Sequence, residues 1–552
     1  MTSLAKVQAA PGATPALKID GVRQVPGYVH GLRASSVVAR VSCDDPVYWR
    51  AVAGRAQASL ASHLSLDVSM DEAGEALSCL AKLIEALQDT AGFPAVGAAR
   101  VLALPAQKGS TASRGRKQWL LAVPSLAPAA ALEALLWTLH YLNELASQPD
   151  VRELSDEQRA DLQRLLQRMS RYAPSGFNNR FFIGAAYELD IPCTPLPGGV
   201  FQYGWGRRAQ WLDSSFTEAT SNISSRLARN KMVTSALLRQ AGLPVPAQQS
   251  VKTLDEAIAA AKTLGYPVVI KPADRDGGLG VSAGLQSPSE LSTAFERASK
   301  HSSQLLIEKH VEGRDYRVYV FRGRAINAMV RVPGSVTGDG VATVRSLVAQ
   351  VNLDPRRGDH FSAPLARIEL DQEALELLGA EGLTPDSIPA EGRFVRLRRS
   401  ANVSTGGMPS AAFDRIHPDN ARLCERAAQI LRLDLAGIDL LMPDIARSWQ
   451  QVGAAICEVN AQPQISSVAL PETFARLMGE LVEMRGRIPT ALVLGGESST
   501  VIVQQTADWL TERNVCVGTS SAAGLRIGAQ RIRAERGSAF KDTRALSIDP
   551  SV

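Results

Sequence analysis

The sequence lacks the clustered thiols and imidazoles of a structural metal protein and the apolar runs of a membrane protein. Its six cysteines and seven histidines are scattered along 552 residues, with no CxxC pair and no metal-ligand spacing. No apolar run approaches the ~18 residues of a membrane span, and no signal-like segment opens the chain. These absences predict free thiols in a reducing compartment, hence a cytoplasmic protein without a membrane partner.

An excess of charge of one sign is also missing. Lysine and arginine number 60 against 55 aspartates and glutamates, a net charge of +5. This gives no reason to expect a nucleic-acid partner, although a locally positive cleft for anionic substrates is compatible with it. A hydrophobic content of 45% with 21% charged residues is ordinary globular composition. The length predicts about two to four domains.

The first 172 residues predict an α+β module whose chemistry the sequence does not indicate. Residues 1 to about 25 are expected to form a loose tail. Residues 36–41 alternate like a strand, whereas residues 129–146 have helical spacing. Further along, helices at 255–264 and 287–300 alternate with strands at 266–271 and 305–310, which indicates α/β layering.

Two later segments bring oxygen ligands together. Residues 436–441 predict a buried strand containing Asp439, and residues 455–460 predict another. Glu458 and Asn460 are two apart and therefore point to the same face. Asp, Glu and Asn oxygens form the kind of site that holds Mg²⁺ with nucleotide phosphates. Alternatively, Asp439 ends a strand and the other two line a solvated edge.

Upstream residues favour the nucleotide interpretation. Lys231 opens a helix, and Lys271 ends an apolar strand, from which it can act as a point charge on phosphate oxygens. Glycines at 277–280, including Gly278 and Gly280, allow close backbone approach to a polyphosphate, although such a loop more often marks a surface turn. Exposed backbone at 309–311 can pair with an adenine edge.

The order of these features, from the helix lysine to the strand Glu-x-Asn, resembles the ATP-grasp superfamily of carboxylate–amine ligases over residues 221–484. Within it the sequence is most similar to cyanophycin synthetases, through residues 351–358, 397–407, 417–420 and 434–439. Gly278-Leu279-Gly280 instead resembles the bifunctional glutathione-synthesising branch. Asn230 also stands where an aspartate commonly precedes the first lysine.

The resemblance implies an ATP-dependent ligase that uses ATP and Mg²⁺ and forms an acyl phosphate. Phosphoryl transfer needs positioning and charge neutralisation rather than a protein nucleophile. The backbone N–H groups of Gly406 and Gly407 are expected to stabilise a tetrahedral oxyanion. By resemblance, ATP is bound by Lys231, Lys271, Gly278, Gly280, Glu308, Lys309, Val311 and Asp315, Mg²⁺ by Asp439, Glu458 and Asn460, and the acyl or phosphoryl group is approached by Arg317, Arg399, Asn402 and Ser404.

The resemblance also implies an α/β and α+β multidomain architecture. We expect an N-terminal α+β module at 1–172, an ATP-grasp domain at 173–485 with its core at 221–485, and a Mur-ligase-like α/β fragment at 486–552. The fragment is expected to be truncated and inactive, because no lysine stands near Ser498 and Ser499 where a P-loop needs one.

The implied substrates are an amino acid, a dipeptide or a polypeptide primer, and the family suggests a homo-oligomer. The leading interpretation is a cyanophycin-synthetase-like ligase that joins aspartate-containing units such as β-aspartyl-arginine. The alternatives are a γ-glutamyl or other small-peptide ligase, and a catalytically silent ATP-binding partner of a full-length synthetase.

Overall fold

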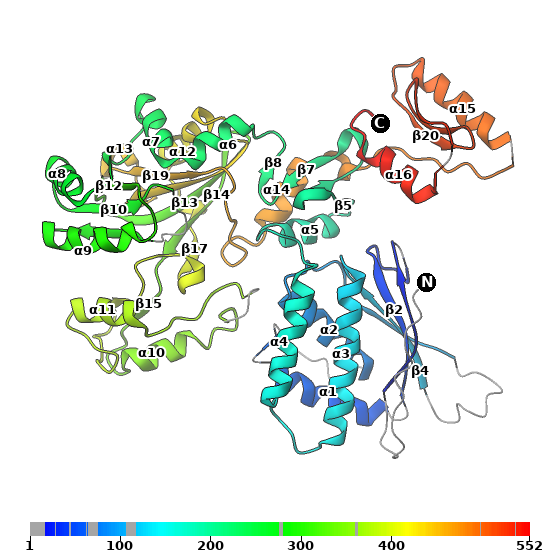
Figure 1. The fold of residues 1–552 in the computed structure, drawn as a ribbon, viewed down its shortest axis with the longest axis horizontal. Coiled ribbons are helices and arrows are strands. Elements are labelled where there is room, and N and C mark those ends of the chain that lie inside the picture. Colours follow the sequence, from blue (N-terminus) through cyan, green and yellow to red (C-terminus); the bar gives the residue numbers. More distant parts are fainter. Residues whose placement is uncertain are drawn as a thin grey trace. The chain divides into compact units, whose positions relative to one another are not determined.

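The structure is a computed structural model that describes residues 17–27, 29–43, 46–61, 63–64, 76–105, 117–274, 280–358, 363–496, 498–535 and 537–552. The chain divides into two compact units (Figure 1). The first ends at Ser175, and the second contains Gly176–Asp359 and Ala363–Val552.

The first unit is an antiparallel sheet with helices packed on one face. The strands, in the order β1-β2-β4-β3, are β1 (Lys18–Val25), β2 (Ser36–Cys43), β4 (Lys117–Pro124) and β3 (Arg100–Ala103), and the helices are α1 (Pro46–Leu60), α2 (Ala76–Thr90), α3 (Pro128–Ser147) and α4 (Asp156–Ser170). Val37, Ala39 and Val41 alternate along β2 into the core shared with the helices. The helices lie together on that side (Figure 1).

The predicted strand at 36–41 and helix at 129–146 are confirmed by β2 and α3. The expectation of a loose tail to about residue 25 is wrong for β1, which pairs along its length with β2. Its sequence, KIDGVRQV, is mostly polar because most of its side chains are exposed. Pairing with a neighbouring strand, rather than an apolar pattern, therefore orders this segment.

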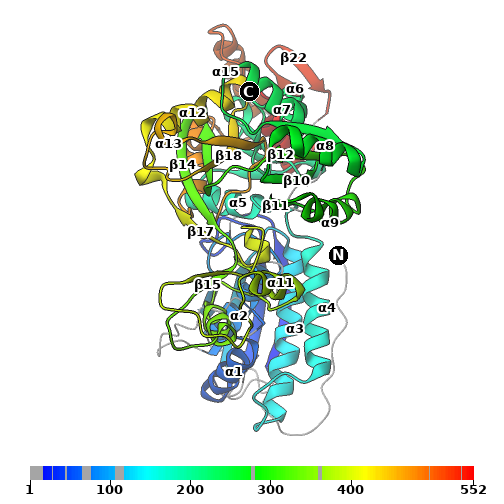
Figure 2. The same ribbon diagram turned by 90° about the vertical axis from the view of Figure 1, so that its left-hand side faces the viewer.

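In the second unit, a four-stranded antiparallel sheet presents one apolar and one polar face. We call it the Lys271 sheet; its order is β11 (Ser282–Leu285), β10 (Val268–Pro272), β12 (Leu305–Lys309) and β9 (Gln248–Val251). Val268, Ile270 and Ile307 pack against α8 (Leu254–Leu264) and α9 (Pro288–Ser299). Figure 2 shows both helices beside these strands. Lys271 and Glu308 lie on the opposite face.

A five-stranded antiparallel sheet, which we call the Asp439 sheet, carries the other predicted ligands. Its order is β17 (Met408–Ala411), β14 (Arg324–Val332), β13 (Arg314–Phe321), β18 (Leu435–Met442) and β19 (Ala455–Asn460). Val318, Ile438 and Leu440 belong to its apolar face. That face packs on α6 (Asn222–Arg229), α7 (Lys231–Gln240) and α12 (Pro418–Ile430), and α13 (Trp449–Val452) lies beside α12 (Figure 2). The polar residues of alternate positions occupy the other face.

The second unit contains further elements besides these two sheets. An insertion between β14 and β17 contains β15 (Ser335–Thr337), α10 (Val344–Val351), α11 (Gln372–Ala380) and β16 (Phe394–Arg396). The other elements are α5 (Asn179–Glu188), β5 (Cys193–Pro195), β6 (Phe201–Tyr203), β7 (Gln210–Asp213), β8 (Phe216–Thr217), α14 (Thr473–Leu481), α15 (Ser498–Thr511), β20 (Gly518–Ser521), β21 (Gly524–Ile527), β22 (Gln530–Arg533) and α16 (Ala539–Ile548). The Gln202 side chain of β6 donates to the Ser547 carbonyl of α16 at 2.7 Å.

Candidate active site

A row of charged residues crosses the polar face of the Asp439 sheet. Arg317 of β13 is paired with Asp439 of β18, which is in turn paired with Glu458 of β19. Asn460 lies two residues further along β19, opposite Gly437. The strand register therefore places the three predicted metal ligands on one face.

A β-bulge in β19 is responsible for this alignment. Leu440 pairs with Ile456 and Asp439 pairs with Glu458, so that Cys457 is the extra residue. Without the bulge, regular pairing from Leu440 and Ile456 would oppose Asp439 to Cys457 and would turn Glu458 to the apolar face. The bulge thus brings the Glu458 carboxyl to the face that carries Asp439.

Asp439 is held by two arginines. Arg317 donates from Nε to Oδ1 at 2.7 Å and from Nη2 to Oδ2 at 2.8 Å, and Arg331 of β14 donates from Nη2 to Oδ2 at 2.9 Å. The same Arg331 nitrogen donates to Asp315 Oδ1 at 2.7 Å. Burial alone would raise the pKa of Asp439, but the two guanidinium groups lower it below its usual value. Burial raises the pKa of Asp315 above its usual value, although Arg331 and Arg317 both act to lower it.

The Lys271 sheet contributes a second buried ion pair. Lys271 and Glu308 lie diagonally across β10 and β12, and their side chains approach to 2.7 Å between Nζ and Oε2. Their side chains are only 12% and 8% exposed. Burial by itself would lower the pKa of Lys271, but Glu308 raises it above its usual value.

Lys231 forms the third ion pair. It is the first residue of α7, and its Nζ lies 3.5 Å from Glu458 Oε1. Asn230 caps this helix by accepting from the N–H groups of Met232 and Val233, so the asparagine performs the capping role open to an aspartate. Lys231 and Glu458 line a small hollow between α7 and β19.

Cys457, the bulge residue of β19, lies within electrostatic reach of charged groups on both sheets. Burial raises the pKa of its thiol to about 12, and the charged groups of Lys271, Glu308, Asp315 and Asp439 all act on it. The structure thus brings together Lys231, Lys271, Glu308, Asp315, Arg317, Asp439 and Glu458. Sequence reasoning missed Arg331 and Cys457. The alternation of Asn327, Met329 and Arg331 along β14 was the signal that could have placed Arg331 on this face.

The predicted adenine-binding backbone is partly engaged already. The N–H of Lys309 donates to the Ala247 carbonyl at 2.9 Å, and that of His310 donates to the Pro267 carbonyl at 3.1 Å. The Lys309 side chain donates to the carbonyls of Gly265 and Tyr266. Within the described part of the chain, Val311 is the one of these three residues whose backbone N–H makes no such bond.

The glycine loop is described only at its end. Gly278 lies outside the described residues. Gly280 has a φ of +72°, and a Cβ there would lie 3.0 Å from the His301 ring and 3.1 Å from Pro272. A side chain at this position would therefore be strained and crowded.

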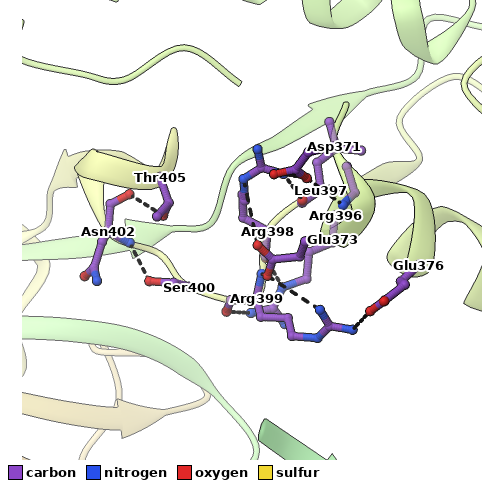
Figure 3. Close-up of polar contacts among 11 residues, drawn as sticks. Asp371, Glu373, Glu376, Arg396, Leu397, Arg398, Arg399, Ser400, Asn402 and Thr405 are labelled. Carbon is purple, nitrogen blue, oxygen red and sulfur yellow. Dashed lines mark hydrogen bonds and ion pairs between the residues drawn. The ribbon is translucent and has the colours of Figure 1, made fainter. Parts of the chain in front are cut away.

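The insertion carries the remaining predicted catalytic residues, and Figure 3 shows Arg399 turned away from Asn402. Arg399 Nη2 donates to Glu376 Oε2 of α11 at 3.0 Å, and its Nη1 lies 3.7 Å from Glu373 Oε1. Asn402 precedes a 3-10 turn at 403–405, and Ser404 on that turn is exposed. Arg399 is therefore tied to α11 in this structure.

The expected oxyanion role of the Gly406 and Gly407 amides is wrong for this structure. The N–H of Gly406 donates to the Val403 carbonyl at 3.3 Å, and that of Gly407 donates to the Asn402 carbonyl at 2.9 Å. Both groups close the turn. A Cβ on Gly407 would lie 2.4 Å from the Ala401 carbonyl oxygen, which explains the glycine.

The donor set fits a divalent cation only together with a ligand. No group of three or more His, Cys, Asp or Glu among the described residues could hold a metal by itself. Asp439 and Glu458 supply two carboxylates, and Asn460 on the same face supplies an amide oxygen, while its buried Nδ2 makes no hydrogen bond to any described residue. One or two carboxylates completed by phosphate oxygens is the usual arrangement for Mg²⁺.

Comparison with known proteins agrees with this geometry. Residues 230–332 match the family model of the carbamoyl-phosphate synthase L chain, ATP binding domain. The cyanophycin synthetase of Nostoc sp. is 32% identical over 392 residues, which are 69% of this chain and 44% of that protein. The chain is related to the cyanophycin synthetases. It spans less than half the length of that cyanophycin synthetase.

Two further matches have names that refer to glutathione synthesis, one a sequence relative and one a solved structure. The glutathione biosynthesis bifunctional protein of Mannheimia succiniciproducens is 32% identical over 270 residues, covering 47% of this chain and 35% of the relative. The crystal structure of a bifunctional glutathione synthetase from Pasteurella multocida has a TM-score of 0.42 at 19% identity, covering 80% of this chain and 81% of that one. The family match and the cyanophycin synthetase relatives confirm the expected multidomain ATP-grasp architecture. No described helix is long and apolar enough to cross a membrane.

Proposed function

We propose that the chain is an ATP-dependent carboxylate–amine ligase. The supporting observation is that five ion pairs, contributed by α7 and by strands of the Lys271 and Asp439 sheets, gather in one part of the second unit. The cations and carboxylates balance before any ligand binds. The four cations are Lys231, Lys271, Arg317 and Arg331, and the four carboxylates are Asp315, Asp439, Glu308 and Glu458.

This balance favours a ligand that brings its own counter-ions. ATP carries roughly four negative charges, and two Mg²⁺ ions offset them, as in other phosphoryl-transfer sites. Asp439, Glu458 and Asn460 would hold the metal, which supplies charge neutralisation on the phosphates. Lys231 and Lys271 would contact phosphate oxygens, with Gly280 beside the triphosphate. Glu308 and the backbone of 309–311, including Lys309 and Val311, would hold adenine, and Asp315 would accept from the ribose hydroxyls.

The proposed reaction has two steps. A substrate carboxylate oxygen attacks the γ-phosphorus, the bond from that phosphorus to the β–γ bridging oxygen breaks, and ADP leaves. The substrate amine then attacks the acyl carbon, phosphate leaves and the amine loses a proton. Arg317, bound to Asp439, would orient the phosphoryl group. Arg399, Asn402 and Ser404 are proposed to contact the acyl or acceptor group, and Arg399 must leave Glu376 to do so.

The proposed substrates are an amino acid, a dipeptide or a polypeptide primer, and the units joined are proposed to contain aspartate, as β-aspartyl-arginine does. The 32% sequence identity to the Nostoc cyanophycin synthetase, over 69% of this chain, supports this class of substrate. A γ-glutamyl or small-peptide ligase is the second candidate, supported by 32% identity to the Mannheimia protein. ADP release should be measured across carboxylate and amine pairs, with mass spectrometry of the products. A polymer supports the first candidate, a soluble dipeptide supports the second, and background ADP release throughout supports a silent ATP-binding partner.

We further propose a domain division at 1–172, 173–485 and 486–552, a homo-oligomer, and a cytoplasmic location that keeps the six free cysteines reduced.

The last segment, 486–552, is proposed to pack rather than catalyse. Its support is that Arg544 donates to the Pro195 carbonyl and Arg208 to the Arg487 carbonyl. Calorimetric titration should then find one ATP analogue per chain, and two would exclude an inactive C-terminal segment. Light scattering of the intact chain tests the oligomer.

A further inference from the structure

Arg331 connects the two carboxylates proposed to bind different parts of the nucleotide–metal complex. One of its nitrogens, Nη2, donates both to Asp315, the proposed ribose ligand, and to Asp439, the proposed metal ligand. Its side chain is 15% exposed, and the Asp439 side chain is 6% exposed. Arg331 thus lies inside the site.

The hydrogen bonds that the Asp439 carboxylate already accepts leave few of its lone pairs for a metal ion. A carboxylate offers about four lone-pair positions. Three of them receive hydrogen bonds here, two from Arg317 and one from Arg331. Two guanidinium groups also repel a cation that approaches this carboxylate.

Arg331 also has hydrogen-bonding capacity that the protein leaves unused. Its Nε atom is buried and has no hydrogen-bond partner among the residues that the structure describes. A buried donor without an acceptor is costly, and an anionic oxygen supplied by a ligand is the strongest acceptor that could relieve this cost. The unsatisfied nitrogen therefore indicates that this guanidinium is built to meet an oxyanion.

We propose that Arg331 keeps Asp439 from binding a divalent cation until a phosphate oxygen of the nucleotide accepts hydrogen bonds from its guanidinium. The inference rests on the proposed ATP-binding function. In this scheme Arg331 contacts the nucleotide directly and acts on the metal through Asp439. The bidentate contact from Arg317 remains, whereas the single contact from Arg331 is the one exchanged.

Mn²⁺ binding provides the direct test. The amount bound is measured from the loss of the paramagnetic resonance signal of free Mn²⁺. The intact wild-type chain, Arg331→Met and Arg331→Lys are titrated with Mn²⁺ alone and with Mn²⁺ plus a non-hydrolysable ATP analogue. Arg324→Met is the matched control, because Arg324 lies on the same strand but is 75% exposed and pairs with Glu480. Melting curves confirm that each variant is folded.

Removing a positive charge beside Asp439 should make Arg331→Met bind Mn²⁺ alone about tenfold or more tightly than the wild type does. Arg331→Lys and Arg324→Met should resemble the wild type, and adding Asp439→Asn to Arg331→Met should abolish the gain. Only variants that melting curves show to be folded are compared, and loss of the gain on adding Asp439→Asn separates gating from a structural role.

Unchanged Mn²⁺ affinity in Arg331→Met, with analogue binding intact, would overturn the gating role alone. If Arg331→Met does not fold, the test rests on the Mn²⁺ affinity of the wild type measured with and without the analogue. Equal affinity in the two conditions also overturns the gating role. Absence of analogue binding by the wild type would instead overturn the proposed function.

Discussion

The pair formed by Lys271 and Glu308 allows stability and activity to be separated. At 2.7 Å with an effective dielectric constant near 20, their attraction is about 6 kcal/mol, and desolvation of both groups offsets much of it. Lys271→Met leaves the Glu308 carboxylate buried without its partner. We therefore expect a loss of about 3–5 kcal/mol in the free energy of unfolding, together with loss of ATP turnover.

The double variant Lys271→Met/Glu308→Gln distinguishes the two effects. It removes the unpaired charge, so most of the stability should return while ATP turnover stays absent. Urea unfolding and ADP release measure the two quantities, and Arg345→Met in the exposed pair with Asp386 should cost no more than about 1 kcal/mol. Wild-type turnover in Lys271→Met would refute the phosphate role, and equal stability of the single and double variants would refute the burial argument.

Three further outcomes can be measured. Burial raises the pKa of Cys193 and of Cys457 to about 12, so a thiol reagent at pH 8 should label both only after unfolding; rapid labelling in the native state would contradict this. Gly407→Ala should destabilise the chain, because a Cβ would lie 2.4 Å from a backbone oxygen, whereas Gly379→Ala in α11 meets nothing within 4 Å and should stabilise it by about 0.5–1 kcal/mol in urea unfolding. The hydrogen bond from Arg356 lowers the pKa of Asp354 to about 2. The ionised Asp354 therefore stabilises the folded state above about pH 4, and this contribution is lost as the pH falls towards 2. The difference in free energy of unfolding between the wild type and Asp354→Asn should decrease over the same pH range.

Local sequence patterns predicted the elements that carry the site. Apolar runs located β10 and β18 because buried strands are continuous in hydrophobicity. Alternation placed Glu458 and Asn460 on one face, and Lys231 was correctly placed at the start of a helix. These predictions depend only on the periodicity of backbone geometry.

Long-range pairing decided the rest. The bulge at Cys457 sets which face of β19 meets Asp439, and strand periodicity cannot reveal an extra residue. Arg331 joins Asp315 and Asp439 because β14 pairs with β13, a register that depends on tertiary packing. The Gly406 and Gly407 amides look available in the sequence, but the folded turn uses them.

The amino-acid sequence by itself determined which strands and helices form around the candidate site, because periodicity is a local property. The residues proposed to bind a metal triphosphate were a prediction from family resemblance. Only the tertiary structure decided that Arg331 shares Asp439 with Arg317 and that Arg399 is tied to Glu376. The register of the strands and the packing of segments far apart in the chain determine such partners. The free energy of these contacts therefore depends on several segments together and cannot be read from any one of them.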